Sequence, residues 1–207
     1  MSGLEFSEPL YNIVYRDGIA STIIPPHTHT AIEFYLTLSP LSDVLLGNHV
    51  LSVPSGTLLL IPSGCVHQLY PESDKIHQRY ILSFEPVLLD LMSLHFLKQH
   101  LTGSVFPILL PLPESDLQIL CRSFADSLNS NSAMDSDSHR AICFLHILNF
   151  AENQIRQLFQ KESTVPLCMT RTQQTVSDLI AYINEHICEP LTLKRIADVF
   201  FLNPNYV

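Results

Sequence analysis

The stretch that decides the fold is PPHTHTAIEFYLTL, residues 25–38, together with GTLLLIPSGCVH, residues 56–67. The first stretch places His27, His29 and Glu33 at positions of the same parity, so on a β-strand all three side chains project from one face. The second stretch ends in a further histidine, after a turn that proline and glycine specify. The spacing therefore predicts two strand-turn units that direct four side chains toward one place.

These four side chains are three imidazoles and one carboxylate, from His27, His29, Glu33 and His67. Imidazole nitrogens and carboxylate oxygens are typical ligands of divalent transition metals such as Zn, Ni, Mn and Fe. We therefore predict a candidate metal site here, with open positions for water or substrate. The alternative is that the same imidazoles hydrogen-bond a ligand or a water inside the fold without a metal.

Short apolar runs recur along the first 84 residues and are separated by turn residues. The turns contain Asp-Gly, Gly-Asn or Pro-Ser-Gly sequences, which supply either a fixed φ or a positive φ. Strands at this spacing, with no helical periodicity between them, predict an antiparallel sandwich or barrel. The runs are 11–15, 34–38, 44–46, 50–53, 57–61 and 80–84, and 105–112 is expected to be a last strand or an extended connector.

Helical periodicity replaces this pattern beyond residue 84. Apolar residues at helical spacing predict helices over 85–101, 114–128 and 139–161. In the last of these, two apolar series recur every seven residues and form an a/d seam, beside a second apolar face. Such a helix suits packing on another subunit as well as on its own barrel; a helix sunk within its own domain is the alternative. The predicted dimer seam is Ala141, Phe144, Leu148, Ala151, Ile155 and Leu158.

The periodicity lapses over 162–174, which we interpret as a linker. Beyond it, apolar spacing predicts a helix over 176–187 and a second over 192–200, with Thr192 as its N-cap. Asn203-Pro204 has the pattern of an N-cap and first residue of a third helix. The chain stops three residues later, so we expect it to be a fragment of something longer.

Composition excludes several classes of protein. Lys and Arg number 11 against 20 Asp and Glu, which leaves a net charge of −9 and argues against nucleic-acid binding through bulk charge. Hydrophobic residues make up 46% of the chain, enough to bury a core. We find neither a secretory signal nor an apolar run long enough for a membrane helix, and five scattered cysteines favour reduced thiols. We expect a cytoplasmic protein.

The two histidine-containing stretches resemble the two cupin motifs, His-x-His-x3-Glu and Gly-x5-Pro-x-Gly-x2-His. The match departs from the enzyme pattern at Pro71, where the second motif usually has Asn, and in a late glycine at Gly47. Residues 180–206 resemble the start of the DNA-binding domain of AraC-type transcription regulators, through Leu191-Thr192-Leu193, Ile196-Ala197 and Asn203-Pro204. A cupin barrel, a helical pair and this domain are the order that the AraC family uses.

The resemblance implies an α+β protein that is a ligand-responsive transcription regulator and not an enzyme. It implies a cupin-like effector-binding barrel over 1–112, a helical dimerisation segment over 113–161, the linker, and a truncated helix-turn-helix domain over 175–207. Its expected partners are a small-molecule effector, a second copy of the chain and, for the full-length protein only, DNA. Candidate effector-pocket residues are Arg16, His27, His29, Glu33 and His67, and candidate DNA-binding residues are Thr192, Lys194, Arg195, Asn203, Asn205 and Tyr206.

A second hypothesis assigns a different function, enzymatic catalysis, to the same barrel. With His27, His29, Glu33 and His67 as ligands, the chain would be a metal-dependent cupin enzyme, such as a dioxygenase or isomerase. The C-terminal helix-turn-helix resemblance argues against it, because an enzyme would not need that element. Neither hypothesis identifies the effector, the operator or the direction of regulation.

Overall fold

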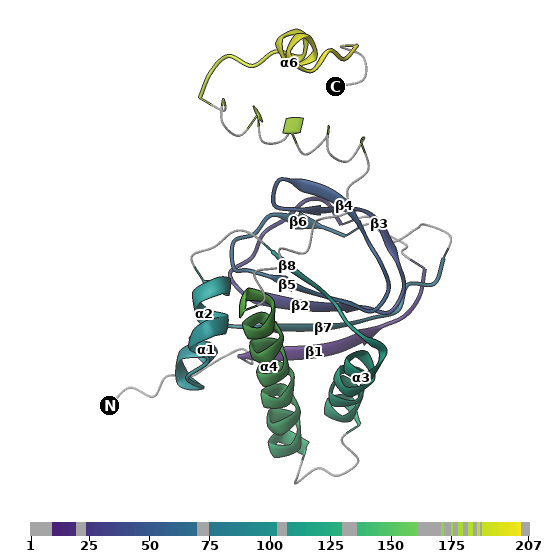
Figure 1. The fold of residues 1–207 in the computed structure, drawn as a ribbon, viewed down its shortest axis with the longest axis vertical. Helices are drawn as coiled ribbons and strands as arrows, with labels where there is room; N and C mark the ends of the chain where they lie inside the picture. The colour runs from purple at the N-terminus through teal and green to yellow at the C-terminus, as the bar shows by residue number, and fades with distance from the viewer. Residues whose placement is uncertain are drawn as a thin grey trace.

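Two antiparallel β-sheets face each other in a barrel, and helices pack on the outside of the larger sheet (Figure 1). In the computed structural model, the placement is described for residues 10–19, 24–69, 75–102, 107–129, 136–160 and 188–203, and for 171, 175, 178, 179, 182, 183 and 186. This arrangement confirms the predicted fold class, an antiparallel cupin-like barrel followed by helices.

The larger sheet has five strands in the order β1-β7-β2-β5-β8, and the smaller has three in the order β4-β3-β6. Every pairing is antiparallel. The predicted strands are all present, together with the last strand expected near residue 108. Their bounds are β1 Tyr11–Arg16, β2 Ile32–Thr37, β3 Leu41–Leu46, β4 His49–Val53, β5 Thr57–Ile61, β6 His67–Gln68, β7 Arg79–Phe84 and β8 Ile108–Pro111.

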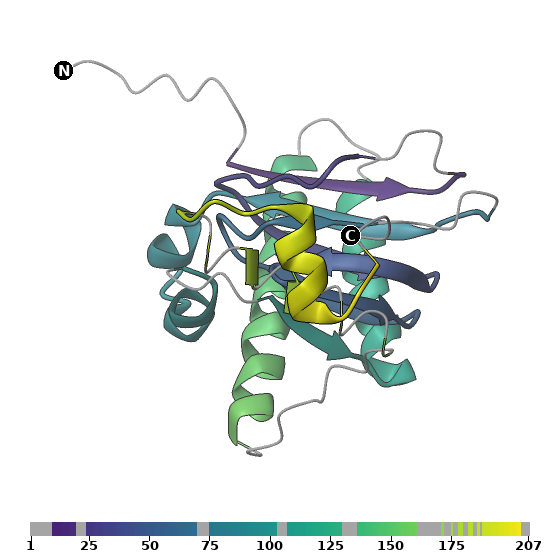
Figure 2. The ribbon, with the colours of Figure 1, turned by 90° about the horizontal axis from the view of Figure 1, so that it is seen from above.

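Alternation along the strands divides the apolar side chains of the larger sheet between two cores. Phe34 and Leu36 of β2 point outward and pack with the helices. Tyr35, between them, points inward and packs with the smaller sheet, against residues such as Val44 and Leu51. The barrel therefore has an inner face of its own, distinct from the core beneath the helices. Seen from above in Figure 2, α4 (green) runs across the direction of the strands.

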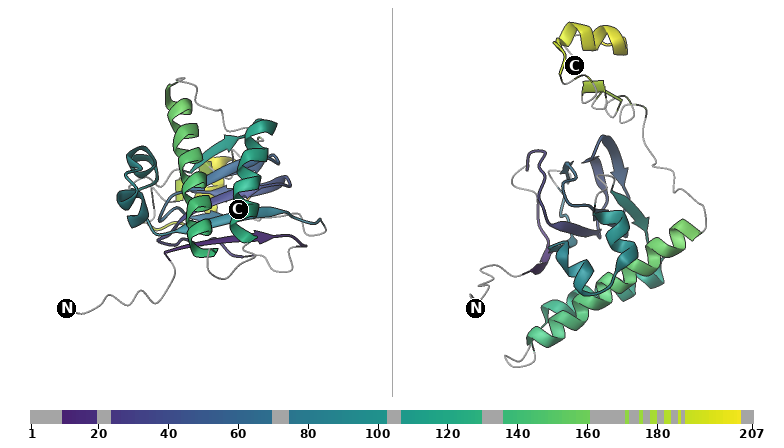
Figure 3. Two further views of the ribbon diagram at one scale, coloured as in Figure 1. Left: turned by 90° about the horizontal axis from the view of Figure 1, so that it is seen from below. Right: turned by 90° about the vertical axis from the view of Figure 1, so that its left-hand side faces the viewer.

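Four helices cover the outer face: α1 Val87–Leu91, α2 His95–Leu101, α3 Glu114–Leu128 and α4 Ser136–Gln160 (Figures 1 and 3). The single helix predicted over 85–101 is wrong, because the chain breaks at Ser93, which has a φ of +57°. α2 is also held from α4: the backbone N–H of Leu97 donates to a carboxylate oxygen of the buried Glu152 at 2.7 Å. Among the described helices, none has both the length and the apolarity to span a membrane.

The predicted seam of the long helix α4 packs inside its own domain. Phe144, Leu148, Ala151 and Ile155 are all at most 1% exposed and belong to the core beneath the larger sheet, where Phe144 stacks on Tyr11. These four residues are therefore inaccessible to a partner, and their prediction as a dimer seam is wrong. The other two positions of the seam, Ala141 and Leu158, are only partly buried.

The C-terminal helix α6, Leu193–Phe200, matches the helix predicted over 192–200. Thr192 is its N-cap, as predicted, because the Thr192 hydroxyl accepts a hydrogen bond from Arg195 N at 3.2 Å. The helix ends at Phe201, which has the left-handed φ of 53°. The linker over 162–174 lies outside the described residues except for 171, and the helix predicted over 176–187 is described only at 178, 179, 182, 183 and 186. Residues 204–207 of the third helix lie outside the described residues.

Candidate functional site

Main-chain hydrogen bonds bring the two histidine-containing stretches together. His27 and His67 form an isolated antiparallel bridge, with N···O distances of 3.1 and 3.0 Å. The turn before His67 is fixed by Gly64, whose φ of +78° suits glycine and whose N–H donates to His29 O at 2.9 Å. The backbone thus places His29 beside the same turn, and the positions of the rings follow from it.

The three imidazole rings gather at one point of the barrel. The ring centroid of His67 lies 4.3 Å from that of His27 and 5.0 Å from that of His29. One nitrogen from each ring lies within 4.8 Å of the others. His67 is buried, while His27 and His29 are partly buried, so the cluster combines an interior side with an accessible one.

Each ring is oriented by a hydrogen bond from its Nδ1 atom to a nearby carbonyl oxygen. The bonds join His27 to Pro25 at 3.0 Å, His29 to Ala31 at 2.8 Å and His67 to Cys65 at 3.0 Å. Because a carbonyl only accepts, Nδ1 carries the proton in each ring, and the neutral ring keeps its lone pair on Nε2. Hydrogen bonds of this kind, from the ring nitrogen that does not face the ligand site, orient the histidine ligands of metals.

Glu33 completes the set from β2. Its Oε2 atom lies 3.3 Å from Nε2 of His29, and its side chain is 14% exposed. The hydrogen bond to Glu33 raises the pKa of His29, whereas burial lowers the pKa of His67. The structure therefore brings the three histidines together and places Glu33 against one of them, His29.

Arg16 does not join this cluster, although it was grouped with the other four as a candidate pocket residue. It is the last residue of β1 and lies opposite Arg79 of β7, whereas Glu33 pairs with Ser83 near the other end of β7. Arg16 is exposed. The predicted pocket residues thus occupy two ends of the same barrel.

The C-terminal candidates for DNA contacts lie on and around α6. Lys194 is exposed on the helix, while Arg195 forms an ion pair with Glu189 at 2.7 Å. Thr192 uses its hydroxyl as the helix cap. Asn203 follows the helix, and Asn205 and Tyr206 lie outside the described residues.

Sequence reasoning missed a buried polar pair in the barrel, Tyr35 and His77. Their side chains are hydrogen-bonded at 2.6 Å between the Tyr35 hydroxyl and Nε2 of His77, and both residues are at most 3% exposed. Burial raises the pKa of Tyr35 and lowers the pKa of His77 to about 4, so both side chains are neutral near pH 7. Strand parity could have indicated Tyr35, because it lies two residues from Glu33 on β2 and therefore on the same face of the sheet.

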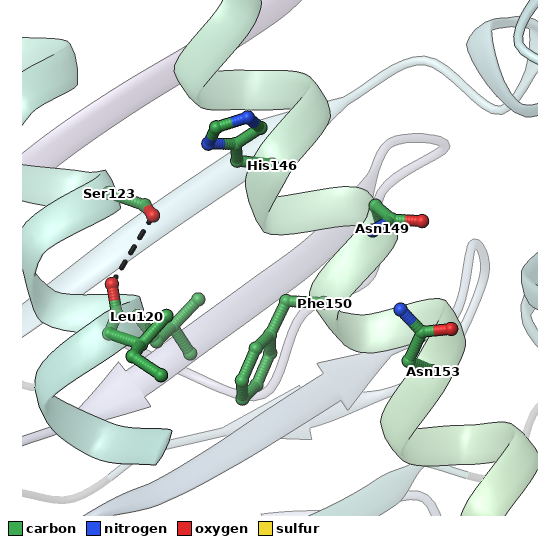
Figure 4. Close-up of a pocket in the computed structure, with 7 residues that line it drawn as sticks. Leu120, Ser123, His146, Asn149, Phe150 and Asn153 are labelled. Atoms are coloured by element: carbon green, nitrogen blue, oxygen red, sulfur yellow. Dashed lines mark hydrogen bonds between the residues drawn. The ribbon is translucent and has the colours of Figure 1, made fainter. Parts of the chain in front are cut away.

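A separate pocket of about 220 Å³ lies between α3 and α4 (Figure 4). Leu120 and Phe150 line it with the exposed Ile119, and His146, Asn149 and Asn153 contribute from α4. Ser123 is turned to its own helix, where its hydroxyl donates to Ile119 O at 3.2 Å. The pocket is therefore an apolar groove with a polar margin, far from the chemistry of the histidine cluster.

Comparison with known proteins gives a family match over residues 12–135, to the AraC-like ligand binding domain. An apo variant of ToxT from Vibrio cholerae is similar in structure, with a TM-score of 0.51 and 9% identity over 97% of this chain and 73% of that chain. The AraC-like transcriptional activator CuxR gives a TM-score of 0.44 and 13% identity, over 95% of this chain and 68% of that chain.

A cupin 2 conserved barrel domain protein from Salinispora arenicola gives a TM-score of 0.34 and 13% identity, over 46% of this chain and 80% of that chain. No curated protein matches the sequence. At these identities the structural likeness to ToxT concerns the fold alone, and the family match is the finding that bears on kinship.

Proposed function

The chain belongs to the family of AraC-like ligand-binding domains, and on that premise we propose that it is a ligand-responsive transcription regulator of the AraC type, acting in the cytoplasm. It senses a small molecule in its barrel and controls promoter binding through C-terminal helix-turn-helix units. The family match and the two facing antiparallel sheets support the sensing half. The capped helix α6 supports the DNA-binding half, at the position where the sequence resembles the first helix-turn-helix.

The observation that carries the sensing half is the convergence of His27, His29, Glu33 and His67. A site that holds three imidazole nitrogens and a carboxylate in fixed positions is preorganised for a ligand. The apolar inner core beside it, with residues such as Tyr35 and Ile61, supplies the apolar surface that ligand pockets usually have. We place the effector site here.

The donor atoms fit a divalent transition metal, Zn, Ni, Mn or Fe, as part of that site. In the neutral ring, the Nε2 lone pair of His29 faces Oε2 of Glu33 at 3.3 Å, so two acceptors face each other. A proton on His29 or a cation between the two groups removes the repulsion. A bound metal would supply a Lewis acid that polarises an oxygen or nitrogen of the effector, while the three rings and Glu33 hold its position.

Metal binding is tested with protein purified without metal-affinity resin. Elemental analysis after dialysis against each metal is expected to give about one equivalent bound. His67→Gln and Glu33→Gln are each expected to weaken binding by roughly 100-fold, because they remove a ligand rather than a supporting contact. The matched control is His146→Gln, an exposed histidine of α4 far from the cluster. Less than a tenth of an equivalent, or equal losses in the control, would contradict the metal.

The DNA-binding half is tested by selecting binding sequences from random duplex DNA with the full-length protein. We expect an enriched sequence whose affinity falls about tenfold in Lys194→Ala, because an exposed lysine on α6 is placed to contact phosphate or bases. The control is Lys98→Ala on α2, whose ammonium group is already paired with Asp90. Failure to enrich any sequence, with or without ligand, would contradict the regulator.

Homodimerisation belongs to the same proposal, and the exposed side of α3 and α4 is the surface we assign to it. Ile119, Ile142 and Leu145 are 58%, 52% and 42% exposed there, beside the groove of Figure 4. Light scattering is expected to give a dimer that Ile142→Asp combined with Leu145→Asp converts to monomer. A monomer before and after substitution would contradict this surface.

A metal-dependent cupin enzyme is the second candidate, favoured by the same donor set of three histidines and Glu33. It is tested by oxygen consumption of Fe(II)-loaded protein in a small-metabolite extract, compared with the Glu33→Gln variant. The regulator predicts equal consumption in both proteins. Consumption that depends on Glu33 would favour the enzyme.

A further inference from the structure

We propose that the end of the barrel opposite the histidine cluster binds an oxyanion, the carboxylate or phosphate group of a small molecule, through Arg16 and Arg79. The inference rests on the proposed sensing function, because it concerns the inner face of the same barrel. It narrows the effector to an anionic small molecule.

The register of the strands places the side chains of both arginines on the inner face of the sheet. Tyr35 and Ile81 face each other across β2 and β7 and both pack in the inner core. Side chains alternate between faces along a strand, so Arg79, two residues before Ile81, lies on the inner face as well. Arg16 is directly opposite Arg79 on β1 and therefore shares that face.

Two cations directly opposite each other on neighbouring strands repel, which destabilises the pair. Within the described part of the chain, neither arginine forms an ion pair with a carboxylate, although Asp17 follows Arg16 directly. Nη1 of Arg79 donates only to the backbone oxygen of His77, at 3.3 Å. Arg16 is exposed and Arg79 is partly exposed, so a ligand can reach both.

An oxyanion relieves this repulsion, because a carboxylate or phosphate accepts paired hydrogen bonds from guanidinium groups. Cations are few in this part of the chain. Residues 1–105 contain four Lys and Arg in all, and two of them, Arg16 and Arg79, lie opposite each other on neighbouring strands. Glu33, the carboxylate on the same face of β2, lies four residues from Thr37, the partner of Arg79. At about 3.3 Å per residue this separation is roughly 13 Å, beyond contact with the arginines.

The buried pair beside Arg79 adds no negative charge to compete with an anion. The Tyr35 hydroxyl and Nε2 of His77 are hydrogen-bonded at 2.6 Å, and burial keeps the pKa of Tyr35 above its ordinary value. Burial lowers the pKa of His77 to about 4, so the pair is uncharged near pH 7. Neither side chain of this pair therefore competes with an anion for Arg79.

A cavity of about 230 Å³ adjoins this end of the barrel. His77, Ser39 and Lys75 contribute to its lining, so it shares His77 with the environment of Arg79. Between the two ends of the inner face lie Val14 and Ile81, apolar and only partly buried. These surfaces fit a ligand whose anionic group lies at the arginines and whose apolar body lies along Val14 and Ile81.

The test is isothermal titration with three probes of the same size at matched ionic strength: benzoate, phenyl phosphate and benzyl alcohol. We expect at least one anion to bind roughly tenfold more tightly than benzyl alcohol, because a hydrogen bond to a charged group is worth about a factor of ten or more. Preference for benzoate identifies a carboxylate and preference for phenyl phosphate identifies a phosphate.

Arg79→Met and Arg16→Met are each expected to abolish this preference, and the matched control Arg122→Met, an exposed arginine of α3, to retain it. Thermal melting checks that each variant folds. If Arg79→Met does not fold, Arg16→Met still tests the inference, because Arg16 is exposed. Equal binding of all three probes, or a preference that survives loss of Arg16, would overturn the inference. Metal content and DNA selection are measured separately, so that outcome leaves the proposed regulator standing.

Discussion

The two faces of the five-stranded sheet are built from the same strands and differ in what they carry. The outer face is apolar from end to end and is covered by helices, through Phe34, Leu36, Leu58, Leu60, Leu82 and Phe84, all at most 1% exposed. The inner face is apolar only in its middle, with Glu33 and Ser83 toward one end and Thr37 and Arg79 toward the other.

This difference separates stability from recognition. A packed apolar face contributes to the free energy of folding in proportion to its burial, and nothing on it is placed to contact a ligand. Polar groups on the inner face cost desolvation and contribute less to stability, so their presence there needs another reason. We expect outer-face substitutions to change folding, and inner-face substitutions to change binding or its pH dependence.

The largest expected effect concerns α4, which borders the outer core on one side and solvent on the other. Leu148→Asp is expected to unfold the protein, with a loss of more than about 4 kcal/mol, because it buries an unpaired charge among apolar side chains. Gln157→Asp, on the exposed side of the same helix and outside the proposed dimer surface, is expected to change the free energy of unfolding by less than about 1 kcal/mol. Urea denaturation and near-UV circular dichroism measure both; equal losses would show that the two sides of α4 do not differ.

A smaller effect is expected from two neighbouring residues of β7 that point to opposite faces. Phe84→Ala is expected to lower the free energy of unfolding by about 3–5 kcal/mol, because Phe84 contacts both Phe34 and Phe144 edge-to-face. Ser83→Ala, on the inner face, is expected to cost less than about 1 kcal/mol. The comparison fails if Ser83→Ala costs as much, or if Phe84→Ala changes metal affinity while the protein remains folded.

The pH dependence of stability gives the third and smallest effect. The pKa of His77 is lowered from 6.5 to about 4, so the folded state favours its neutral form. The stability that this contributes is complete above pH 6.5 and is lost as the pH falls toward 4, by roughly 3 kcal/mol in all. Urea denaturation at pH 7 and pH 4.5 is expected to show a smaller loss in His77→Gln than in the native protein.

The control for this measurement is His95→Gln, an exposed histidine at the start of α2, which is expected to leave the pH dependence unchanged. If native and His77→Gln proteins lose the same stability between the two pH values, the burial of the Tyr35–His77 pair does not govern it. The difference between the two proteins separates His77 from the other histidines.

The sequence predicted the strands and the histidine cluster because both depend on local rules. The motif spacing singled out His27, His29 and Glu33, and the Pro-Ser-Gly turn places His67 at the start of the next unit. Strand parity does not explain the first two histidines, because β2 begins only at Ile32; main-chain hydrogen bonds to the 64–67 segment place them instead. The break at Ser93 could not be predicted, because the helical spacing of apolar residues over 85–101 continues through it. Nothing in that spacing indicates the positive φ of Ser93.

The role of α4 was underdetermined for a similar reason. An apolar stripe has the same pattern whether it packs on its own sheet or on a partner, so Phe144 and Leu148 could not be assigned from spacing. The cross-strand meeting of Arg16 and Arg79 depends on the register of two strands more than 60 residues apart. No local pattern encodes that register, so this pair emerges only in three dimensions.

The backbone bridge between His27 and His67 has a consequence for how a signal can arise. Since two main-chain hydrogen bonds already join His27 and His67, the effector site that we propose is formed in the unliganded protein. Arrival of an occupant then requires little reordering of the chain around it. If this is the effector site, we expect a bound ligand to act on the rest of the protein through a small change in an ordered structure, and not through the folding of a disordered segment.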